Sequence, residues 1–212
     1  EGTKTKLQYG KTELSVNTTL IGEFNLSNIM AAIAVSLNMG IPPYKLEQAM
    51  KILPPIPGRF EQVPCNCLGK VFIDYAHTPD AFEKLFSSIA ELINEENKII
   101  TVFGCGGDRD AGKRSKMAQI CETYATFSFI TMDNPRTESF DKINSDIVQG
   151  FSGSNYEIIT NRKTAIETAL SRMNDHSILL VLGKGLENYQ EIGTEKHPHS
   201  DVDIIRGFQH AG

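Results

Sequence analysis

The stretch "KIITVFGCGGDRDAGKR" (residues 98–114) contains an apolar run that ends abruptly in glycines and charged residues. The run is typical of a strand buried on both faces, because its apolar residues do not alternate with polar ones. A helical pattern follows, in which Met117, Ile120, Cys121 and Tyr124 share one face. A buried strand, a turn and an amphipathic helix form the repeating unit of an α/β fold.

The same unit recurs in the second part of the chain. Further apolar runs lie at residues 71–75, 126–132, 156–160 and 178–182. Between them, residues with helical spacing include Phe82, Leu85, Phe86, Ile89 and Ile93; Phe140, Ile143 and Ile147; and Ala165, Ile166, Ala169 and Leu170. This alternation predicts an α/β fold with a doubly wound, mostly parallel, Rossmann-like sheet and helices on both faces. Ser200 followed by Asp203 resembles a capping box that opens a last helix.

The beginning of the chain follows a different pattern. Residues 1–21 hold short alternations of Thr, Val and Leu, which predict edge strands and a hairpin. A helix is expected over residues 26–37, with Asn25 or Ser27 as its cap. A shorter helix is expected over residues 43–52.

A proline-rich segment, "LPPIPGRF" (residues 53–60), follows these helices. Three prolines in so short a span predict a stiff linker. We therefore expect a domain boundary here, with one unit over residues 1–57 and a second over residues 58–212.

Composition excludes several classes of protein. The chain has 212 residues, of which 40% are hydrophobic and 22% charged, and its net charge is −5. These values are typical of soluble globular proteins, and no basic block favours nucleic acid. No apolar run approaches the roughly 18 residues of a membrane span, and no signal-peptide core is visible. We expect a cytoplasmic protein without a metal site, whose four cysteines (Cys65, Cys67, Cys105 and Cys121) are reduced.

Polar segments follow four of the five predicted strands. They are "DYAHTPD" (74–80), "GCGGDRDAGKR" (104–114), "DNPR" (133–136) and "GKGLE" (183–187). Ligands of parallel sheets bind beyond the carboxyl ends of the strands, so these segments should converge on one site. The "DNPR" turn has an alternative interpretation as a mere helix N-cap, with proline in the first turn. "GKG" is not a phosphate-binding P-loop, because the spacing of that motif is absent.

The charged residues of these segments indicate the ligand. Arg109 and Arg136 can each bind a carboxylate through two parallel hydrogen bonds, and Glu187 can pair with a cation. A ligand that carries both a carboxylate and an ammonium group fits this set.

The segments "GEFNLSNIMAA", "GRFE", "DYAHTPDAFEK", "GCGGDRDAGKR", "DNPR" and "GKGLENYQ" together resemble the Mur ligases. The likeness runs from about residue 22 to the end of the chain. Within the family, the chain is most similar to the type that adds meso-diaminopimelate to UDP-N-acetylmuramoyl-L-alanyl-D-glutamate in peptidoglycan precursor synthesis. That resemblance implies an ATP- and Mg²⁺-dependent ligase that forms an amide through an acyl phosphate.

The resemblance also implies roles for individual residues. The residues implied for meso-diaminopimelate are Arg109, Asp133, Asn134, Pro135, Arg136, Gly183 and Glu187. The residues implied for ATP are Asn25 at the adenine, Asp74 at the ribose, and Arg59 and His77 on the phosphate side. The form "DNPR" goes with meso-diaminopimelate, since lysine-adding relatives lack the final arginine. Leu186 departs from the family, in which a histidine is usual at this place.

The resemblance further implies that this chain is a fragment. Residues 1–57 would be the helical and strand remnant of a central ATPase domain, and residues 58–212 the amino-acid-binding domain. The P-loop, most magnesium ligands, the catalytic residues and the domain for the UDP-sugar would belong to missing parts of the polypeptide. Two alternatives remain: a lysine-adding or folylpolyglutamate-type ligase, and a non-catalytic nucleotide-binding Rossmann-like domain.

The isolated 212-residue chain is therefore expected to have no ligase activity and no appreciable ATP hydrolysis. A phosphate-release assay with ATP, meso-diaminopimelate and the UDP-dipeptide measures both activities. Phosphate release above a blank without protein would contradict this expectation.

Overall fold

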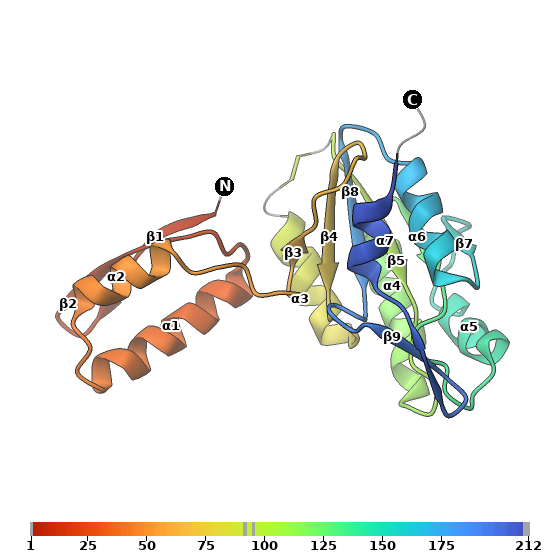
Figure 1. Cartoon of the computed structure of the whole chain (residues 1–212), viewed down its shortest axis with the longest axis horizontal. Helices are drawn as coiled ribbons and strands as arrows, with labels where there is room; N and C mark the ends of the chain where they lie inside the picture. Colours follow the sequence, from red (N-terminus) through yellow and green to blue (C-terminus); the bar gives the residue numbers. More distant parts are fainter. Residues whose placement is uncertain (1, 91–92, 95, 210–212) are drawn as a thin grey trace. The chain divides into compact units, whose positions relative to one another are not determined.

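The computed structural model describes residues 2–90, 93–94 and 96–209. The chain divides into two compact units, Glu1–Ile56 and Pro57–Gly212. Figure 1 labels most of the helices and strands of each unit. None of the helices in the described ranges has the length and apolar character that crossing a bilayer requires.

The first unit packs a hairpin against two helices. Strands β1 (Thr3–Tyr9) and β2 (Thr12–Thr18) pair antiparallel, and helices α1 (Glu23–Asn38) and α2 (Pro43–Lys51) follow. Every second side chain of β2 is buried, as expected for a strand with one face on a core. The core consists of Leu14, Val16, Leu20, Ile29, Ile33, Leu46 and Met50. The predictions of a hairpin and two helices are confirmed.

The predicted cap of α1 is wrong. Gly22 is the N-cap residue, at φ 96°, and makes no side-chain cap hydrogen bond. Asn25 lies inside the first turn, where its Nδ2 donates to the Ile21 carbonyl at 2.8 Å. The helix begins three residues before its apolar pattern does, because glycine adopts the positive φ of the entry turn without a steric penalty. The apolar pattern alone does not reveal this.

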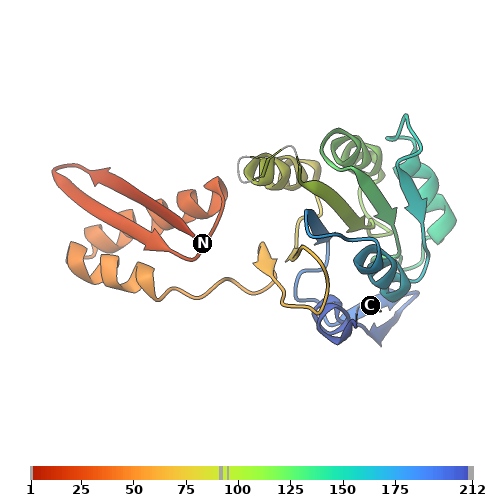
Figure 2. The same ribbon diagram turned by 90° about the horizontal axis from the view of Figure 1, so that it is seen from above.

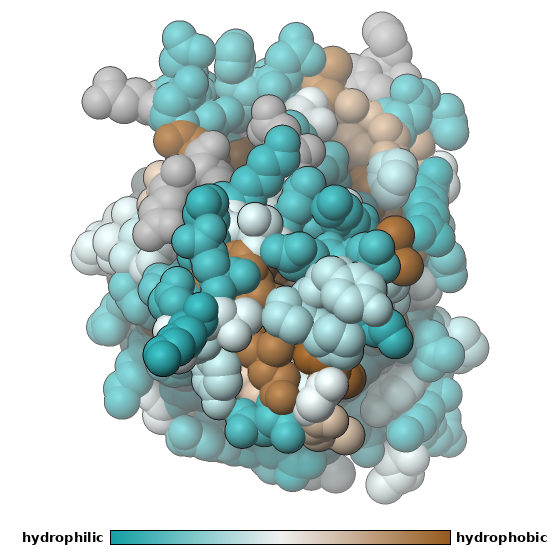
Figure 3. Space-filling view, turned by 90° about the vertical axis from the view of Figure 1, so that its left-hand side faces the viewer, coloured by the Kyte–Doolittle hydropathy of each residue, from teal (hydrophilic) through white to brown (hydrophobic). Residues whose placement is uncertain are grey.

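The first unit also exposes several large apolar side chains, among them Val35, Met39, Tyr44 and Ile52. Hydrophobic surface is visible between hydrophilic side chains in the view of Figure 3.

The second unit is built on a six-stranded sheet in the order β3-β4-β8-β5-β6-β7. Its strands are β3 (Glu61–Gln62), β4 (Lys70–Asp74), β5 (Lys98–Phe103), β6 (Phe127–Ile130), β7 (Tyr156–Ile158) and β8 (Ser177–Leu182). The short edge strand β3 pairs antiparallel, and all other neighbours pair parallel. The predicted doubly wound, mostly parallel sheet is confirmed, and β3 is an addition to it.

Helices cover both faces of this sheet (Figures 1 and 2). One core holds side chains of α3 (Pro79–Ala90), α4 (Arg114–Tyr124) and α5 (Phe140–Val148). The other holds side chains of α6 (Arg162–Ser171) and α7 (Asp201–Gly207). Strand residues alternate between the two cores, since successive side chains of a strand point to opposite faces. The central strands are therefore mostly apolar and are buried on both faces.

Some local features differ from the sequence expectations. Ile93 lies beyond α3, although it still packs against the same core. A short 3₁₀ helix, η1 (Ala111–Lys113), precedes α4, and a hairpin of β9 (Tyr189–Ile192) and β10 (Glu195–Pro198) precedes α7. The hairpin is mostly exposed, and its sequence has no alternation that would predict strands.

The structure joins Cys65 and Cys67 by a disulfide, so the expectation of four reduced cysteines is wrong. Both residues lie in the connection between β3 and β4, with their Cα atoms 5.4 Å apart. Cys105 and Cys121 are free and buried. Burial raises the pKa of the Cys105 thiol to about 12 and also raises the pKa of Cys121. Both thiols are therefore protonated at neutral pH.

A buried ion pair ties α6 to α7. Arg162 and Asp201 are fully buried, with 2.7 Å between Nη2 and Oδ2. Arg162 Nη2 also donates to the carbonyl of Leu182, the last residue of β8, at 3.0 Å. Burial alone would raise the pKa of Asp201, but the charge of Arg162 and the hydrogen bonds from Arg162 and His199 outweigh burial and lower it.

Asp201→Ala leaves the Arg162 guanidinium buried without its carboxylate, and we expect a loss of about 3–5 kcal/mol in the free energy of unfolding. Glu157→Ala breaks the exposed pair with Arg172 and should cost less than about 1 kcal/mol. Urea denaturation at pH 7 measures both. Because folding lowers the pKa of Asp201, the pair stabilises fully above the unfolded pKa of about 3.9 and is lost as the pH falls through the folded value. Equal effects of the two substitutions at pH 7 would contradict this account.

Candidate functional site

A cavity of about 230 Å³ lies at the carboxyl edge of the parallel strands. Its lining residues are Tyr75, His77, Gly104, Cys105, Gly106, Arg109, Lys113, Asp133, Asn134, Arg136, Gly183 and Glu187. They come from the segments after β4, β5, β6 and β8. The predicted convergence of these four segments is therefore confirmed.

The cavity collects most of the residues that the sequence singled out. All those expected to hold an amino acid line it, except Pro135. Of those expected to hold a nucleotide, His77 lines it, and Arg59 and Asp74 lie outside its lining but within the same unit. Asn25 belongs to the first unit.

The glycine segment after β5 packs directly on the "DNPR" segment. A Cβ atom on Gly104 would overlap the Thr131 carbonyl oxygen, and one on Gly107 would overlap that of Pro135. The Gly107 N–H donates to the Asn134 carbonyl at 2.9 Å. These glycines allow two backbones to approach more closely than any side chain would permit. The glycine cluster in the sequence therefore reflects the close packing of two backbones as well as a turn.

Arg136 is held on several sides. Its φ is 52°, in the left-handed region that non-glycine residues rarely adopt. Its Nε lies 3.0 Å from Glu191 Oε2, and its Nη1 donates to the Gly107 carbonyl at 2.9 Å. Its backbone N–H and C=O bond to Glu191 and Gly193 of the β9–β10 hairpin. The hairpin, which the sequence did not predict, thus orients the guanidinium.

The "DNPR" turn does not cap a helix. The N-cap of α5 is Ser139, whose Oγ accepts from the Lys142 N–H at 3.3 Å. The alternative interpretation of the turn as a helix cap is therefore wrong.

A lysine that the sequence analysis passed over lies behind the cavity. The Lys184 side chain is fully buried. Its Nζ donates to Asn134 Oδ1 at 2.8 Å, to Glu187 Oε2 at 3.1 Å and to the Tyr189 carbonyl at 2.9 Å. Asn134 Nδ2 in turn donates to Glu187 Oε2 at 2.9 Å. The sequence signal that could have indicated this lysine is its position between two glycines at the end of a strand.

A second buried cation supports the glycine segment. Arg114 Nη2 lies 2.6 Å from Glu138 Oε2, and Nη1 lies 2.7 Å from Asp146 Oδ2. Arg114 also donates to the Gly106 carbonyl at 3.2 Å. The hydrogen bonds from Arg114 hold the pKa of Glu138 well below its usual range, although burial acts in the opposite direction. Glu138 therefore stays charged, and Arg114 fastens the glycine segment to α5 through Asp146.

Asp74 holds the backbone around the segment after β4 through hydrogen bonds. Asp74 Oδ1 and Oδ2 accept the N–H groups of Ala76 and Phe60 at 2.6 and 2.7 Å. Burial raises the pKa of Asp74, while these two hydrogen bonds lower it by less. The Arg59 guanidinium lies 4.9 Å from the centre of the Tyr75 ring, and the Tyr75 and His77 ring centres are also 4.9 Å apart. Asp74 thus shapes the local backbone, and Tyr75, which lines the cavity with His77, contacts both His77 and Arg59.

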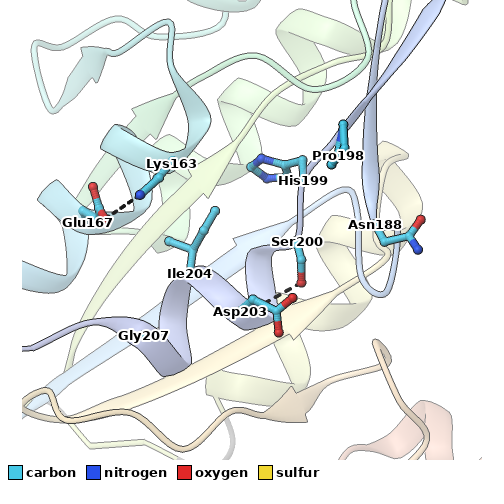
Figure 4. Close-up of a pocket in the computed structure, with 9 residues that line it drawn as sticks. All are labelled: Lys163, Glu167, Asn188, Pro198, His199, Ser200, Asp203, Ile204 and Gly207. Atoms are coloured by element: carbon cyan, nitrogen blue, oxygen red, sulfur yellow. Dashed lines mark hydrogen bonds and ion pairs between the residues drawn. The ribbon is translucent and has the colours of Figure 1, made fainter.

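Figure 4 shows a second cavity, of about 550 Å³, lined by residues of α6, α7 and the segment from Asn188 to Ser200. Some of its polar side chains are paired within the protein: Lys163 Nζ lies 3.8 Å from Glu167 Oε1, and Ser200 Oγ accepts from the Asp203 N–H. No residue expected to contact a ligand lines it. We therefore assign the candidate site to the cavity at the carboxyl edge.

This chain is similar to known proteins over most of its length. Residues 58–185 match the family model described as Mur ligase, glutamate ligase domain. A curated protein of Syntrophomonas wolfei, named UDP-N-acetylmuramoyl-L-alanyl-D-glutamate--2,6-diaminopimelate ligase, is 40% identical over 98% of this chain. The chain belongs to the Mur ligase family. The resemblance that the sequence motifs indicated is confirmed.

This Mur ligase chain spans about two fifths of the length of the curated relatives it matches: 43% of the Syntrophomonas wolfei protein and 39% of a protein of the same name from Chlamydia pneumoniae, which is 42% identical. A solved structure of a UDP-N-acetylmuramoyl-L-alanyl-D-glutamate--2,6-diaminopimelate ligase matches with a TM-score of 0.68 and 33% identity, over 95% of this chain and 41% of that one. A Mycobacterium tuberculosis folylpolyglutamate synthase complexed with ADP and AMPPCP matches with a TM-score of 0.68, over 85% of this chain and 42% of that one. At 21% identity, the synthase shows a shared fold alone.

Gly107→Ala should destabilise the second unit, because its Cβ would overlap the Pro135 carbonyl. Overpacking of this kind costs about 1–3 kcal/mol, which corresponds to a fall in Tm of about 2–12 °C for a unit of this size. Gly207→Ala is the matched control, since its Cβ would meet no atom within 4 Å. Scanning calorimetry of both variants measures the difference in Tm. Equal Tm values would show that the glycine segment and the "DNPR" segment can move apart without loss of stability.

Proposed function

We propose that this chain supplies the amino-acid site of an ATP-dependent ligase that adds meso-diaminopimelate to UDP-N-acetylmuramoyl-L-alanyl-D-glutamate, in peptidoglycan precursor synthesis in the cytoplasm. The observation that carries the proposal is the cavity in which Arg109, Arg136 and Glu187 meet. The names of the curated relatives, at about 40% identity, support the same activity.

The cavity suits one end of an amino acid. Arg109, Lys113 and Arg136 provide positive charge, and Asp133 and Glu187 provide negative charge. A ligand end with a carboxylate and an ammonium group satisfies both sets, because guanidinium groups bind carboxylates through paired hydrogen bonds. Meso-diaminopimelate has such a group at each end, so one end can be held here while the amine of the other end reacts.

In the proposed reaction, the D-glutamate carboxylate attacks the γ-phosphate of ATP, which yields an acyl phosphate and ADP. The free amine of diaminopimelate then attacks the acyl carbon, and the tetrahedral intermediate expels phosphate as the amide forms. This chain contributes by positioning that amine, an effect that can supply several kcal/mol of barrier reduction. The rigid hold on Arg136 described above suits this task.

The nucleotide contacts are also proposals. Arg59 and His77 both contact Tyr75, which lines the cavity, and we propose that they meet phosphate oxygens there. Asp74 is proposed at the ribose and Asn25 at the adenine, on the strength of the resemblance. Within the described ranges, no three His, Cys, Asp or Glu side chains are grouped so as to hold a metal ion. We propose Mg²⁺ as the companion of ATP and place no step on it.

The domain assignment is proposed with the activity. Residues 58–212 would form the amino-acid-binding domain, and residues 1–57 the end of a central ATP-binding domain. The compact units Glu1–Ile56 and Pro57–Gly212 support a boundary near this point.

Arg136→Lys tests the substrate in the full-length protein. Lysine keeps the charge but loses the fork that bonds the Gly107 carbonyl and Glu191. We expect kcat/KM for meso-diaminopimelate to fall by about 10- to 10³-fold, while the low value for L-lysine, which lacks the second carboxylate, changes little. Both values are measured at saturating ATP and UDP-dipeptide.

Arg172→Lys is the matched control, because Arg172 forms an exposed pair with Glu157 outside the cavity. It should leave both values unchanged. A wild-type preference for lysine would indicate the lysine-adding alternative, and a preference for a folate and glutamate the folylpolyglutamate alternative. If Arg136→Lys lowers kcat/KM by the same factor for both amino acids, Arg136 does not bind the second carboxylate.

A further inference from the structure

We propose that Lys184 is the positioning residue that determines which atoms Asn134 and Glu187 present to the cavity, and thereby selects a ligand with a carboxylate beside an ammonium group. This inference rests on the proposed function and concerns the same site.

The backbone forces Lys184 inward. Gly183 and Gly185, its two neighbours, have φ values of 107° and 51°, in the region that favours glycine. A Cβ on Gly183 would also come within 2.7 Å of Asp133 Oδ2. The turn so formed leaves the Lys184 side chain fully buried, where an ammonium group is costly unless its hydrogens are paired. Its contacts to Asn134, Glu187 and the Tyr189 carbonyl use all three N–H donors.

Lys184 and the Glu191 N–H together determine the orientation of the Asn134 amide. Asn134 Oδ1 accepts from Lys184 Nζ at 2.8 Å and from the Glu191 N–H at 2.9 Å. Both partners can only donate, so the oxygen of the amide has to face them. Nδ2 then faces Glu187, and one of its two hydrogens serves Glu187 Oε2. Asn134 can therefore offer the cavity an N–H donor, which suits a carboxylate.

Lys184 also determines what Glu187 offers. Oε2 of Glu187 accepts from both Lys184 and Asn134, at 3.1 and 2.9 Å. Oε1 accepts no hydrogen bond from any residue in the part of the chain that the structure describes. The carboxylate is thus anchored by one oxygen and presents the other as an acceptor, which suits an ammonium group. Donor and acceptor lie on adjacent side chains held by the same buried cation.

Loss of the ammonium group should weaken the arrangement in which Asn134 presents a donor and Glu187 presents an acceptor. In Lys184→Met, the Asn134 oxygen keeps only the Glu191 N–H as its donor, and Glu187 loses the cation that anchors it, so both side chains are held less firmly. Methionine has a similar length, so the buried space remains filled. The variant should therefore lose discrimination between ligands more than it loses the fold.

The test compares Lys184→Met with Lys163→Met in the full-length protein. Lys163 is exposed on α6 and makes a single ion pair, with Glu167, outside this cavity. The substrates are meso-diaminopimelate, L-lysine, which lacks the second carboxylate, and 2-aminopimelate, which lacks the second ammonium group. We expect Lys184→Met to raise KM for meso-diaminopimelate by about 10-fold or more, and to reduce its advantage over both analogues to within about 3-fold. Lys163→Met should keep the wild-type ratios.

A second measurement needs no ligand. Hydrogen exchange of the Asn134 side-chain amide, followed by NMR, should be slow in the wild type and in Lys163→Met, and faster by about 10-fold or more in Lys184→Met. If Lys184→Met does not fold, the same measurements are made on Lys184→Gln. Glutamine keeps two N–H donors without the charge, so we expect a smaller effect.

The outcomes separate the two proposals. Unchanged substrate ratios in a folded Lys184→Met variant, or an equal rise of KM for all three substrates, would overturn the role of Lys184. Unchanged exchange of the Asn134 amide would also overturn it. If the wild-type protein does not use meso-diaminopimelate, the proposed function fails, whereas the exchange experiment still decides whether Lys184 holds the amide.

Discussion

Parallel pairing of β4, β8, β5 and β6 is the constraint on which the rest of this structure depends. It brings the carboxyl ends of these strands to one edge, so the segments that follow them must share a small space. Glycines relieve that crowding, since Gly104 and Gly107 allow backbone to pack on the Thr131 and Pro135 carbonyls. The cavity is what remains between segments that are already in contact.

Buried cations then hold these segments in place. Arg114 fastens the glycine segment to α5, Arg162 joins the end of β8 to α7, and Lys184 joins Asn134 to Glu187. Each cation is fully buried and bonds to groups from distant parts of the chain. A buried charge tolerates few arrangements, because loss of one partner leaves the other uncompensated. Such a network favours one fixed arrangement of the site, which is what recognition of a small charged ligand requires.

The β9–β10 hairpin shows how an exposed element can serve a buried site. Glu191 pairs with Arg136 Nε, and the backbones of Glu191 and Gly193 bond that of Arg136. The same hairpin supplies the Glu191 N–H that orients the Asn134 amide. Two elements therefore hold the residues proposed to recognise the amino acid. Lys184 bonds Asn134 and Glu187, and the hairpin bonds Arg136 and Asn134.

The sequence by itself determined the α/β fold, the central strands and the edge at which the site lies. It could do so because apolar periodicity and polar strand ends are local signals of burial and of topology. The helix cap at Gly22, the disulfide between Cys65 and Cys67 and the β9–β10 hairpin escaped it, since each depends on backbone geometry without an apolar pattern. Lys184 in particular is an ordinary charged residue in the sequence. Only the tertiary structure showed that positive φ at Gly183 and Gly185 turns it inward, because one of its partners, Asn134, lies 50 residues earlier in the sequence.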